Sequence, residues 1–325
     1  MPTGFLLLAS ALTHIHPGSG RAPGIVDSPV QKDPYNYPIL MASSAKGALK
    51  SFCIRRSGAL KNDKCLSSDG RIRCEDCESA KVCCCFFGSE PQEEAQTSLL
   101  SILDFVPLTF PVPSANAGYV YVTTPMLLRR ASQVVYALEL HNYAEALEKL
   151  ADMAESKSLV IGSALSEDVD IAGATLEFNR VELSEGLKNL MRCIEELKGL
   201  ASVATKRLVV VSDGIGASIV DKALIRLTRI RLQISKKTVM KRALWTEEYI
   251  PSGTIFISGL VVNYISNKYC GEVLGEDYMN KDNLVSIVYK KLKGMLGEDE
   301  FMFFVGGKES IGRGLIKVKI YYPMQ

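Results

Sequence analysis

The chain has 325 residues, of which 47% are hydrophobic and 23% charged, and its formal net charge is +2. These values fit an ordinary soluble globular protein of one or two domains with enough chain to bury a core. So small a net charge does not by itself indicate a nucleic-acid-binding protein, so any basic surface must come from a local cluster. No segment reaches the ~18 apolar residues that a membrane span requires, and we expect no membrane partner.

The first apolar run, Gly4 to Leu12, is similar to the hydrophobic part of a signal peptide. No lysine or arginine precedes it, however, and it continues directly into a histidine and a glycine-rich turn. We therefore interpret residues 5–13 as a buried first strand.

Residues 13–50 combine several features that suit a phosphate backbone. After the strand come His16, a loop with Gly18, Gly20 and Gly24, an extended segment with Asp27, and a helix expected over residues 43–56. Ser43 or Ser44 is a suitable N-cap for that helix. Flexible backbone and a helix N-terminus with a nearby lysine favour phosphate binding over a small metabolite.

Residues 57–98 are polar and rich in cysteine, and we interpret them as an insertion. The chain has nine cysteines, an odd number, and six of them lie between Cys65 and Cys85. This argues against an extracellular disulfide framework and for a reducing cytoplasm. Cys65, Cys74, Cys77 and Cys83 have spacings that structural zinc tolerates, although adjacent cysteines leave the fourth ligand undefined. The alternative is a set of free thiols.

The remaining elements alternate between strands and helices. We expect a strand over 99–112, helices over 126–154 with a break near His141, and a further helix over 184–198, so that 126–200 forms a helical insertion. Strands follow over 207–212 and 255–264, a hairpin over 226–244, a helix over 281–296, and strands over 301–305 and 315–322. This order predicts an α+β fold without internal repeats.

The loop between the last two strands reads G-G-K-E-S-I-G-R-G and is only superficially like a P-loop. Met302 stands where a P-loop needs glycine, and Glu309 stands where it needs serine or threonine. The loop is either a tight hairpin or a glycine backbone that approaches RNA phosphates, with Lys308 and Arg313 supplying charge.

Residues 222–242 contain eight lysines or arginines and no acid. Arg229 and Arg231 alternate with apolar residues, which gives the hairpin one cationic and one apolar face. A solvated surface is the simpler interpretation, but such segregation in a nearly neutral protein favours a polyanionic partner. A second group of cations lies on the first helix: Lys46, Lys50, Arg55 and Arg56.

His14 and His16 point to the same side of their strand, but with His141 as the one other histidine we do not expect a histidine metal site. His16, next to the glycine turn, is a candidate for acid–base or orienting work. Asp27, between an apolar pair and Ser28-Pro29, is expected in an extended loop, and the alternative is a residue that caps a turn.

Several motifs in this order together resemble the RAMP superfamily: H-P-G-S-G, G-I-V-D-S-P-V-Q-K, S-S-A-K-G-A-L-K, C-C-F-F-G, T-E-E-Y-I-P and G-G-K-E-S-I-G-R-G-L-I-K-V. Within it they are similar to the repeated backbone subunits of the Cmr complex, the type III-B CRISPR effector that targets RNA. The similarity covers nearly the whole chain. One departure is Ala42, which stands before the two serines where the family usually has glycine.

The resemblance implies a single domain over residues 1–325: a ferredoxin-like (RRM-like) palm with insertions at 57–98 and 126–200 and a thumb hairpin at 222–250. It also implies a cytoplasmic filament of several copies along a CRISPR RNA, together with other Cmr subunits. Each copy would cut the paired target RNA with a divalent metal, Mg²⁺ or Mn²⁺.

The family's catalytic positions correspond to Asp27, His16, Glu247 and Tyr249. Among these the roles of base, acid and metal ligand stay open. CRISPR RNA contacts are expected from the glycine turns, the first helix and the cationic hairpin, namely Gly18, Ser19, Arg21, Ser43, Ser44, Lys46, Lys50, Arg229, Arg231, Gly307, Lys308 and Arg313.

Cleavage would use the ribose 2′-hydroxyl, which can attack its own phosphodiester once the thumb has unstacked the nucleotide. Two alternatives remain: a non-catalytic scaffold in which Asp27 caps a loop, and an endonuclease that matures CRISPR RNA precursors.

Overall fold

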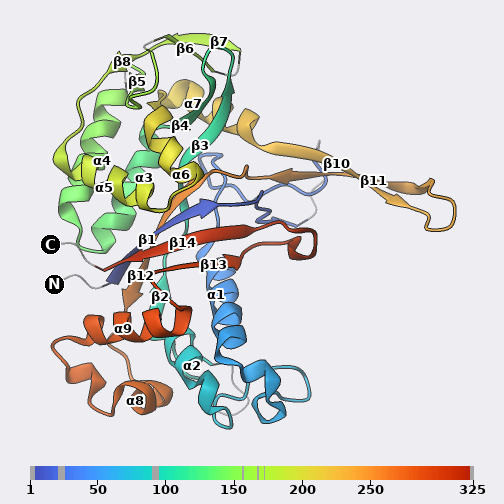
Figure 1. The fold of residues 1–325 in the computed structure, drawn as a ribbon, viewed down its shortest axis with the longest axis vertical. Coiled ribbons are helices and arrows are strands. Elements are labelled where there is room, and N and C mark those ends of the chain that lie inside the picture. The colour runs from blue at the N-terminus through green and yellow to red at the C-terminus, as the bar shows by residue number, and fades with distance from the viewer. Residues whose placement is uncertain are drawn as a thin grey trace.

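The computed structural model describes residues 4–20, 26–89, 95–155, 157–166, 168–171 and 173–322. At its centre lies a ten-stranded sheet in the order β13-β14-β1-β12-β3-β4-β9-β5-β8, with β2 paired to β12 (Figure 1). The strands of this sheet are β1 (Gly4–Ala11), β2 (Leu100–Ile102), β3 (Val106–Ser114), β4 (Gly118–Thr123), β5 (Leu159–Val160), β8 (Asn179–Arg180), β9 (Leu208–Val210), β12 (Ile255–Val262), β13 (Glu300–Phe304) and β14 (Leu315–Tyr321). Two further pairs are β6 (Asp168–Ile171) with β7 (Ala174–Glu177), and β10 (Ile225–Leu232) with β11 (Val239–Tyr249).

The helices surround this sheet. They are α1 (Ala42–Ser57), α2 (Lys81–Phe87), α3 (Pro125–Ala137), α4 (His141–Ala154), α5 (Glu185–Glu196), α6 (Leu200–Ala204), α7 (Asp213–Ala223), α8 (Lys268–Leu274) and α9 (Leu284–Leu296). Short 3-10 helices are η1 (Ala59–Lys61), η2 (Asp63–Cys65), η3 (Glu78–Ala80), η4 (Thr205–Arg207), η5 (Tyr278–Asn280) and η6 (Glu309–Ile311). No helix in the described residues is long and apolar enough to cross a membrane.

The palm is the part of the sheet in which β14, β1, β12 and β3 lie side by side and antiparallel. Along the chain, α1 follows the first of these strands and α9 lies between β12 and β14. This order of strands and helices is that of a ferredoxin-like βαββαβ unit. The expected α+β palm is therefore confirmed.

Strand β1 is apolar on both sides because both sides are covered. Phe5 and Leu7 pack with the core that includes α1 and α9, whereas Leu6 and Leu8 pack with the core formed by α3 to α6. All eight residues of the strand are buried. A continuous apolar run is what a strand between two layers requires, and the expected first strand is confirmed.

The expected serine cap of α1 is wrong. The helix begins at Ala42, and Met41 occupies the N-cap position without a side-chain hydrogen bond. Instead, the Ala42 N–H donates to Oδ1 of Asp104, 2.6 Å away and 62 residues further along the chain. Because a distant carboxylate satisfies this N–H, Ser43 and Ser44 are left in the first helical turn, where they line a cavity.

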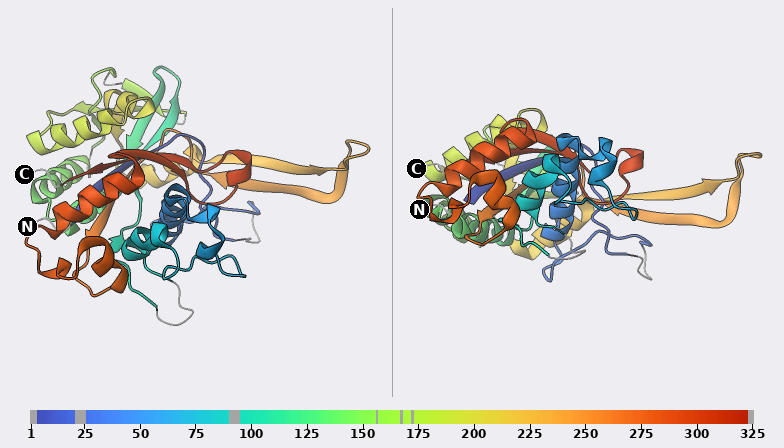
Figure 2. Two further views of the ribbon diagram at one scale, coloured as in Figure 1. Left: turned by 60° about the horizontal axis from the view of Figure 1, so that its bottom comes forward. Right: turned by 90° about the horizontal axis from the view of Figure 1, so that it is seen from below.

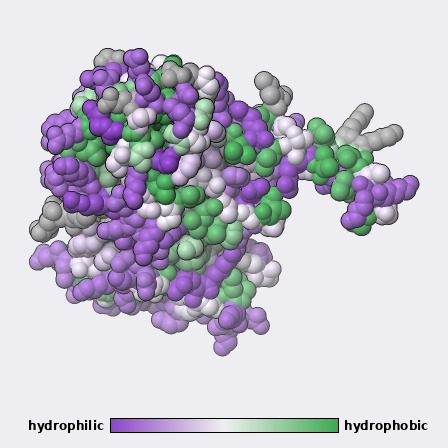
Figure 3. Space-filling model, turned by 45° about the horizontal axis from the view of Figure 1, so that its top comes forward, coloured by the Kyte–Doolittle hydropathy of each residue, from purple (hydrophilic) through white to green (hydrophobic). Residues whose placement is uncertain are grey.

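The hairpin β10–β11 projects far beyond the body of the molecule (Figures 1 and 2). Its register runs from Ile225 opposite Tyr249 to Leu232 opposite Val239. Apolar side chains are exposed along the arm, among them Ile230, Ile234 and Leu244. In the space-filling view hydrophobic patches are visible on the projecting arm (Figure 3).

The cysteine-rich segment contains disulfides rather than a zinc site. Four disulfides link Cys53 to Cys83, Cys65 to Cys77, Cys74 to Cys84, and Cys85 to Cys270. The proposed ligands Cys65, Cys74, Cys77 and Cys83 are thus shared among three bonds, and a disulfide sulfur offers no thiolate to a metal. Among the described residues no group of three or more His, Cys, Asp or Glu side chains could hold a metal ion.

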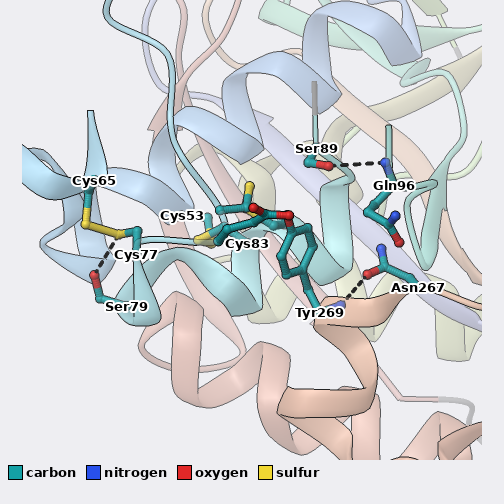
Figure 4. The surroundings of a disulfide bond; sticks show 12 residues. Cys53, Cys65, Cys77, Ser79, Cys83, Ser89, Gln96, Asn267 and Tyr269 are labelled. Carbon is teal, nitrogen blue, oxygen red and sulfur yellow. Dashed lines mark hydrogen bonds between the residues drawn. A yellow bond between two sulfur atoms is a disulfide. The ribbon is translucent and has the colours of Figure 1, made fainter. Parts of the chain in front are cut away.

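Three of these bonds are local, whereas the bond from Cys85 to Cys270 joins segments 185 residues apart. We call residues 53–89 together with α8 the cysteine lobe; Figure 4 shows its interior, where Cys77 lies against Ser79 and Asn267 caps α8 by accepting from the Tyr269 N–H. The odd cysteine is Cys193, buried in the helical insertion. This pairing corrects the prediction that the clustered cysteines bind zinc or are free thiols.

Candidate functional site

Strand β11 carries two sets of functional side chains on its opposite sides, at the place where the hairpin joins the body. We call residues 225–229 and 245–249 the hairpin root. Alternation along the strand places Trp245, Glu247 and Tyr249 on one side and Thr246 and Glu248 on the other. The hydrogen bonds agree, since Trp245 and Tyr249 both donate to Glu247.

Glu247 is a buried, ionised carboxylate. Its Oε1 accepts from Nζ of Lys308 at 2.6 Å and from Nε1 of Trp245 at 2.8 Å, and its Oε2 accepts from the hydroxyl of Tyr249. Nε of Arg229 lies 3.8 Å from Oε2. Burial alone would raise the pKa of Glu247, but these hydrogen bonds outweigh it and lower the pKa to about 2.

Tyr249 is fully buried beside this carboxylate. Burial, and then the hydrogen bond to Glu247, raise the pKa of Tyr249 to about 12. The guanidinium carbon of Arg313 lies 5.2 Å from the centre of the tyrosine ring, a cation–π contact. The imidazole of His16 lies on the same ring, with 5.4 Å between ring centres.

His16 is held in one tautomer. Its Nδ1 is 2.7 Å from the carbonyl oxygen of Glu248, and because a carbonyl accepts only, Nδ1 carries the proton. Glycines are required on both sides of this residue: a Cβ at Gly18 would lie 2.9 Å from Nε2, and a Cβ at Gly306, whose φ is +80°, would lie 2.7 Å from the His16 carbonyl oxygen. Nε2 is thus the ring nitrogen left for other partners.

Asp27 is exposed and lies on the other side of β11. Its Oδ2 accepts from the N–H of Thr246 at 2.7 Å and from the Thr246 hydroxyl at 3.0 Å. Ser28 forms a parallel bridge with Glu247, so the loop adds a short strand to the edge of β11. Of the four predicted catalytic residues, the structure clusters His16, Glu247 and Tyr249 and anchors Asp27 separately.

A cavity of about 840 Å³ lies between α1, the loop after β1 and the loop after β13. It is lined by His16, one of the predicted catalytic residues, and by four of the predicted RNA-binding residues, Gly18, Ser43, Ser44 and Gly307. Its other lining residues include Phe52, Arg55 and Arg56 of α1, and Arg55 is paired with Glu309 at 3.2 Å. The sequence placed the two arginines among the cations of the first helix but did not predict that they line this cavity.

The other predicted RNA-binding residues lie elsewhere. Lys46 donates to the hydroxyl of Ser98 at 3.0 Å, and the Ser19 hydroxyl donates to the Pro29 carbonyl at 3.3 Å. Lys308 and Arg229 face Glu247, as described above, whereas Lys50 lies on α1 and Arg231 is exposed on the hairpin arm. Arg21 lies outside the described residues.

Sequence reasoning missed the residues that fix the Asp27 loop. Arg226 bonds Glu248 at 3.1 Å and Asp221 at 2.8 Å, and Lys32 bonds the same Asp221 at 2.7 Å. The sequence could have shown that Thr246 and Glu248 lie on the side of the strand opposite Glu247 and Tyr249, because successive side chains of a strand such as T-E-E-Y alternate between its two faces. Nothing in the sequence indicated the partners of Arg226 and Lys32.

Comparison with known proteins decides the family. Residues 8–317 match the RAMP superfamily over nearly the full chain. The chain belongs to the RAMP superfamily. The motif resemblance is therefore confirmed at the level of the family.

This RAMP protein is similar along its length to proteins of known systems. It is 27% identical to the CRISPR system CMR subunit Cmr4 of Saccharolobus solfataricus, covering 95% of this chain and 94% of that protein. It is 26% identical to the CRISPR system Cmr endoribonuclease Cmr4 of Pyrococcus furiosus, covering 97% and 95%. The type III-B Cmr-beta structure in the apo state has a chain with a TM-score of 0.69 and 25% identity, covering 98% of this chain and 96% of that one.

Proposed function

We propose that this chain is a backbone subunit of a type III-B CRISPR Cmr complex that binds CRISPR RNA and cleaves complementary target RNA. Full-length similarity to two Cmr4 proteins, one of them named an endoribonuclease, supports the proposal. The observation that carries it is the exposed carboxylate of Asp27, fixed at the root of a hairpin that projects from the palm. The partners would be CRISPR RNA, target RNA, further copies of the chain in a filament, and other Cmr subunits.

The guide strand would lie in the cavity beside α1. The first turn of this helix, with Ser43 and Ser44, presents N–H groups and the positive end of the helix dipole to phosphates. Gly307 adds backbone that a phosphate can approach closely, and Arg55 and Arg56 add charge. Such contacts follow the backbone and ignore the base sequence, as a subunit repeated along any guide requires.

Target cleavage would begin at the ribose 2′-hydroxyl. The carboxylate of Asp27 accepts the hydroxyl proton, the 2′-oxygen bonds to the adjacent phosphorus, and the bond to the 5′-oxygen breaks. The products are a 2′,3′-cyclic phosphate and a 5′-hydroxyl, which takes its proton from solvent. The hairpin would hold the nucleotide out of its stack so that the attacking and leaving oxygens are in line.

Glu247 and Tyr249 hold the hairpin root in this scheme and do not transfer protons. With a pKa near 2, Glu247 is a poor base, and its oxygens already accept from Lys308, Trp245 and Tyr249. The Tyr249 hydroxyl donates to that carboxylate, and its pKa of about 12 keeps it protonated. His16 would face the guide, because its Nδ1 donates to Glu248 while the residue lines the cavity.

A divalent cation fits this site only as a bridge to RNA. The described residues form no cluster of three ligands, and Glu247 is occupied by its own donors. Asp27 supplies one carboxylate, and Mg²⁺ commonly completes its shell with phosphate oxygens and water. A bound Mg²⁺ or Mn²⁺ would neutralise phosphate charge at the cleavage site.

One observation favours a second candidate, a scaffold that binds RNA without cutting it. The hydrogen bonds between Asp27 and Thr246 are also what a loop-capping aspartate makes. In that case the fold and the partners would be the same. The isolated maturation endonuclease considered above gains no support from the described geometry.

Replacing Asp27 with asparagine distinguishes the two candidates, because the amide keeps the shape but cannot take a proton. We expect Asp27→Asn to assemble with guide RNA and bind target normally while target cleavage falls at least ~100-fold. The matched control is Asp277→Asn, an exposed aspartate near α8, which should cleave at the wild-type rate. Undiminished cleavage by Asp27→Asn would favour the scaffold.

A further inference from the structure

Three hydrogen bonds join Thr246 to Asp27, two through the threonine hydroxyl and one through its N–H. The Thr246 hydroxyl donates to Oδ2 of Asp27 at 3.0 Å and accepts from the Asp27 N–H at 3.1 Å. The Thr246 N–H donates to the same Oδ2 at 2.7 Å. One threonine therefore fixes both the backbone and the carboxylate of Asp27.

The rest of the loop is tied to the same strand. The Ser28 N–H donates to the Thr246 carbonyl at 3.1 Å, and the Glu248 N–H donates to the Ser28 carbonyl at 3.0 Å. Further along, the Val30 N–H donates to Oε2 of Glu248 at 3.3 Å. Two alternate residues of β11, Thr246 and Glu248, therefore set the path of residues 27–30 through both their backbones and their side chains.

We propose that Thr246 is a positioning residue for target RNA cleavage, whose hydroxyl aims the carboxylate of Asp27 at the scissile nucleotide. This rests on the catalytic role proposed for Asp27. Because β11 continues into the hairpin arm, the carboxylate keeps a constant position relative to the element that bends the target strand. Thr246 thus couples the hairpin to the group that takes the proton.

The size of the expected effect follows from geometry. An active-site group displaced by ~1 Å can lose about 100-fold in rate even when the rest of the site is intact. In a Thr246→Val variant the N–H still holds Oδ2, so the carboxylate stays near its place and loses only its second donor. We therefore expect a fall in rate of roughly 10- to 100-fold, less than that of Asp27→Asn.

The test compares Thr246→Val with Thr246→Ser in the assembled complex with guide RNA. Valine keeps the shape and the strand propensity but removes the hydroxyl, whereas serine keeps the hydroxyl. Single-turnover cleavage should fall with valine and return to within about threefold of wild type with serine. Target affinity should be unchanged in both, because neither side chain is proposed to bind RNA.

The matched control is Thr228→Val, the same substitution directly across the hairpin from Thr246. Thr228 is exposed, and its side chain makes no hydrogen bond within the part of the chain that the structure describes. We expect it to cleave at the wild-type rate. Thermal melting of all three variants checks that they fold, and if valine prevents assembly, Thr246→Ala replaces it in the same comparison with serine.

The outcomes separate this inference from the proposed function. If Asp27→Asn stops cleavage but Thr246→Val cleaves normally, or if serine fails to restore the rate, Thr246 does not position Asp27 and the inference is wrong. If Asp27→Asn cleaves normally, the catalytic proposal itself fails and the inference falls with it. Loss with valine, recovery with serine and no change with Thr228→Val support both.

Discussion

The cysteine lobe and the hairpin root are held in place by different interactions. The lobe is joined by four disulfides among buried cysteines, one of which links α2 to α8 across 185 residues. The root is held by charged hydrogen bonds around Glu247 and Glu248, and the arm beyond it is exposed. Covalent bonds thus fix the helix that lines the cavity, while the element expected to act on the target is fixed at one end only.

This difference suits two tasks. Cys53 lies on the buried side of α1, whereas Ser44, Phe52 and Arg55 of the same helix line the cavity. A rigid α1 would hold the residues that bind the guide RNA backbone at constant positions. A hairpin anchored only at its root can adjust to the strand that it bends, because few contacts along the arm have to break.

The largest expected effect comes from the disulfides. Replacing both Cys85 and Cys270 with serine should lower the free energy of unfolding by about 5 kcal/mol, because this bond closes the longest loop, of 185 residues. Replacing Cys65 and Cys77, 12 residues apart, should cost about 3 kcal/mol. Chemical denaturation measures both, and the unfolded, unreduced protein should show a single thiol, that of Cys193. A count of nine thiols would contradict the pairing.

The next effect concerns the buried charge at the root. Glu247→Ala should lower the free energy of unfolding by about 3 kcal/mol, because Lys308 and Tyr249 lose the carboxylate that they bond. Glu309→Ala removes an exposed partner of Arg55 and should change stability by less than ~1 kcal/mol. Equal losses in the two variants would mean that the root is not held by its buried charge.

A smaller effect is expected from acid. The pKa of Glu247 is lowered to about 2, so the ionised carboxylate stabilises the folded state above its ordinary pKa of 4.5. That contribution is lost as the pH falls from about 4.5 towards 2, because the unfolded chain takes up the proton first. Between pH 4.5 and 2 the free energy of unfolding, measured by chemical denaturation, should fall more steeply with decreasing pH for wild type than for Glu247→Gln. Equal pH dependence in the two proteins would contradict a lowered pKa for Glu247.

The smallest effect on stability is expected on the hairpin arm. Ile230 and Leu244 face each other across the hairpin and are exposed, so replacing both with serine should change the free energy of unfolding by less than ~1 kcal/mol. Target cleavage should nevertheless fall, since the arm is proposed to bend the target strand. Thermal melting and single-turnover cleavage measure the two quantities, and unchanged cleavage would remove the arm from the mechanism.

The sequence by itself determined the features that depend on neighbouring residues. Periodicity located α3 to α5, the projecting hairpin and the last strands, because side chains three or four apart in a helix, or two apart in a strand, share a face. The ordered motifs identified the RAMP superfamily and placed His16, Gly18, Ser43, Ser44 and Gly307, which all line one cavity.

Only the tertiary structure decided what depends on contacts between distant segments. Which cysteines pair cannot be deduced from their spacing, so the bond from Cys85 to Cys270 was hidden. The sequence also did not predict the cap of α1 by Asp104 or the contact of Asp27 with Thr246, because these partners lie 62 and 219 residues apart along the chain. Local patterns specify the elements and their faces, but the partner that each face meets is set by how the whole chain packs.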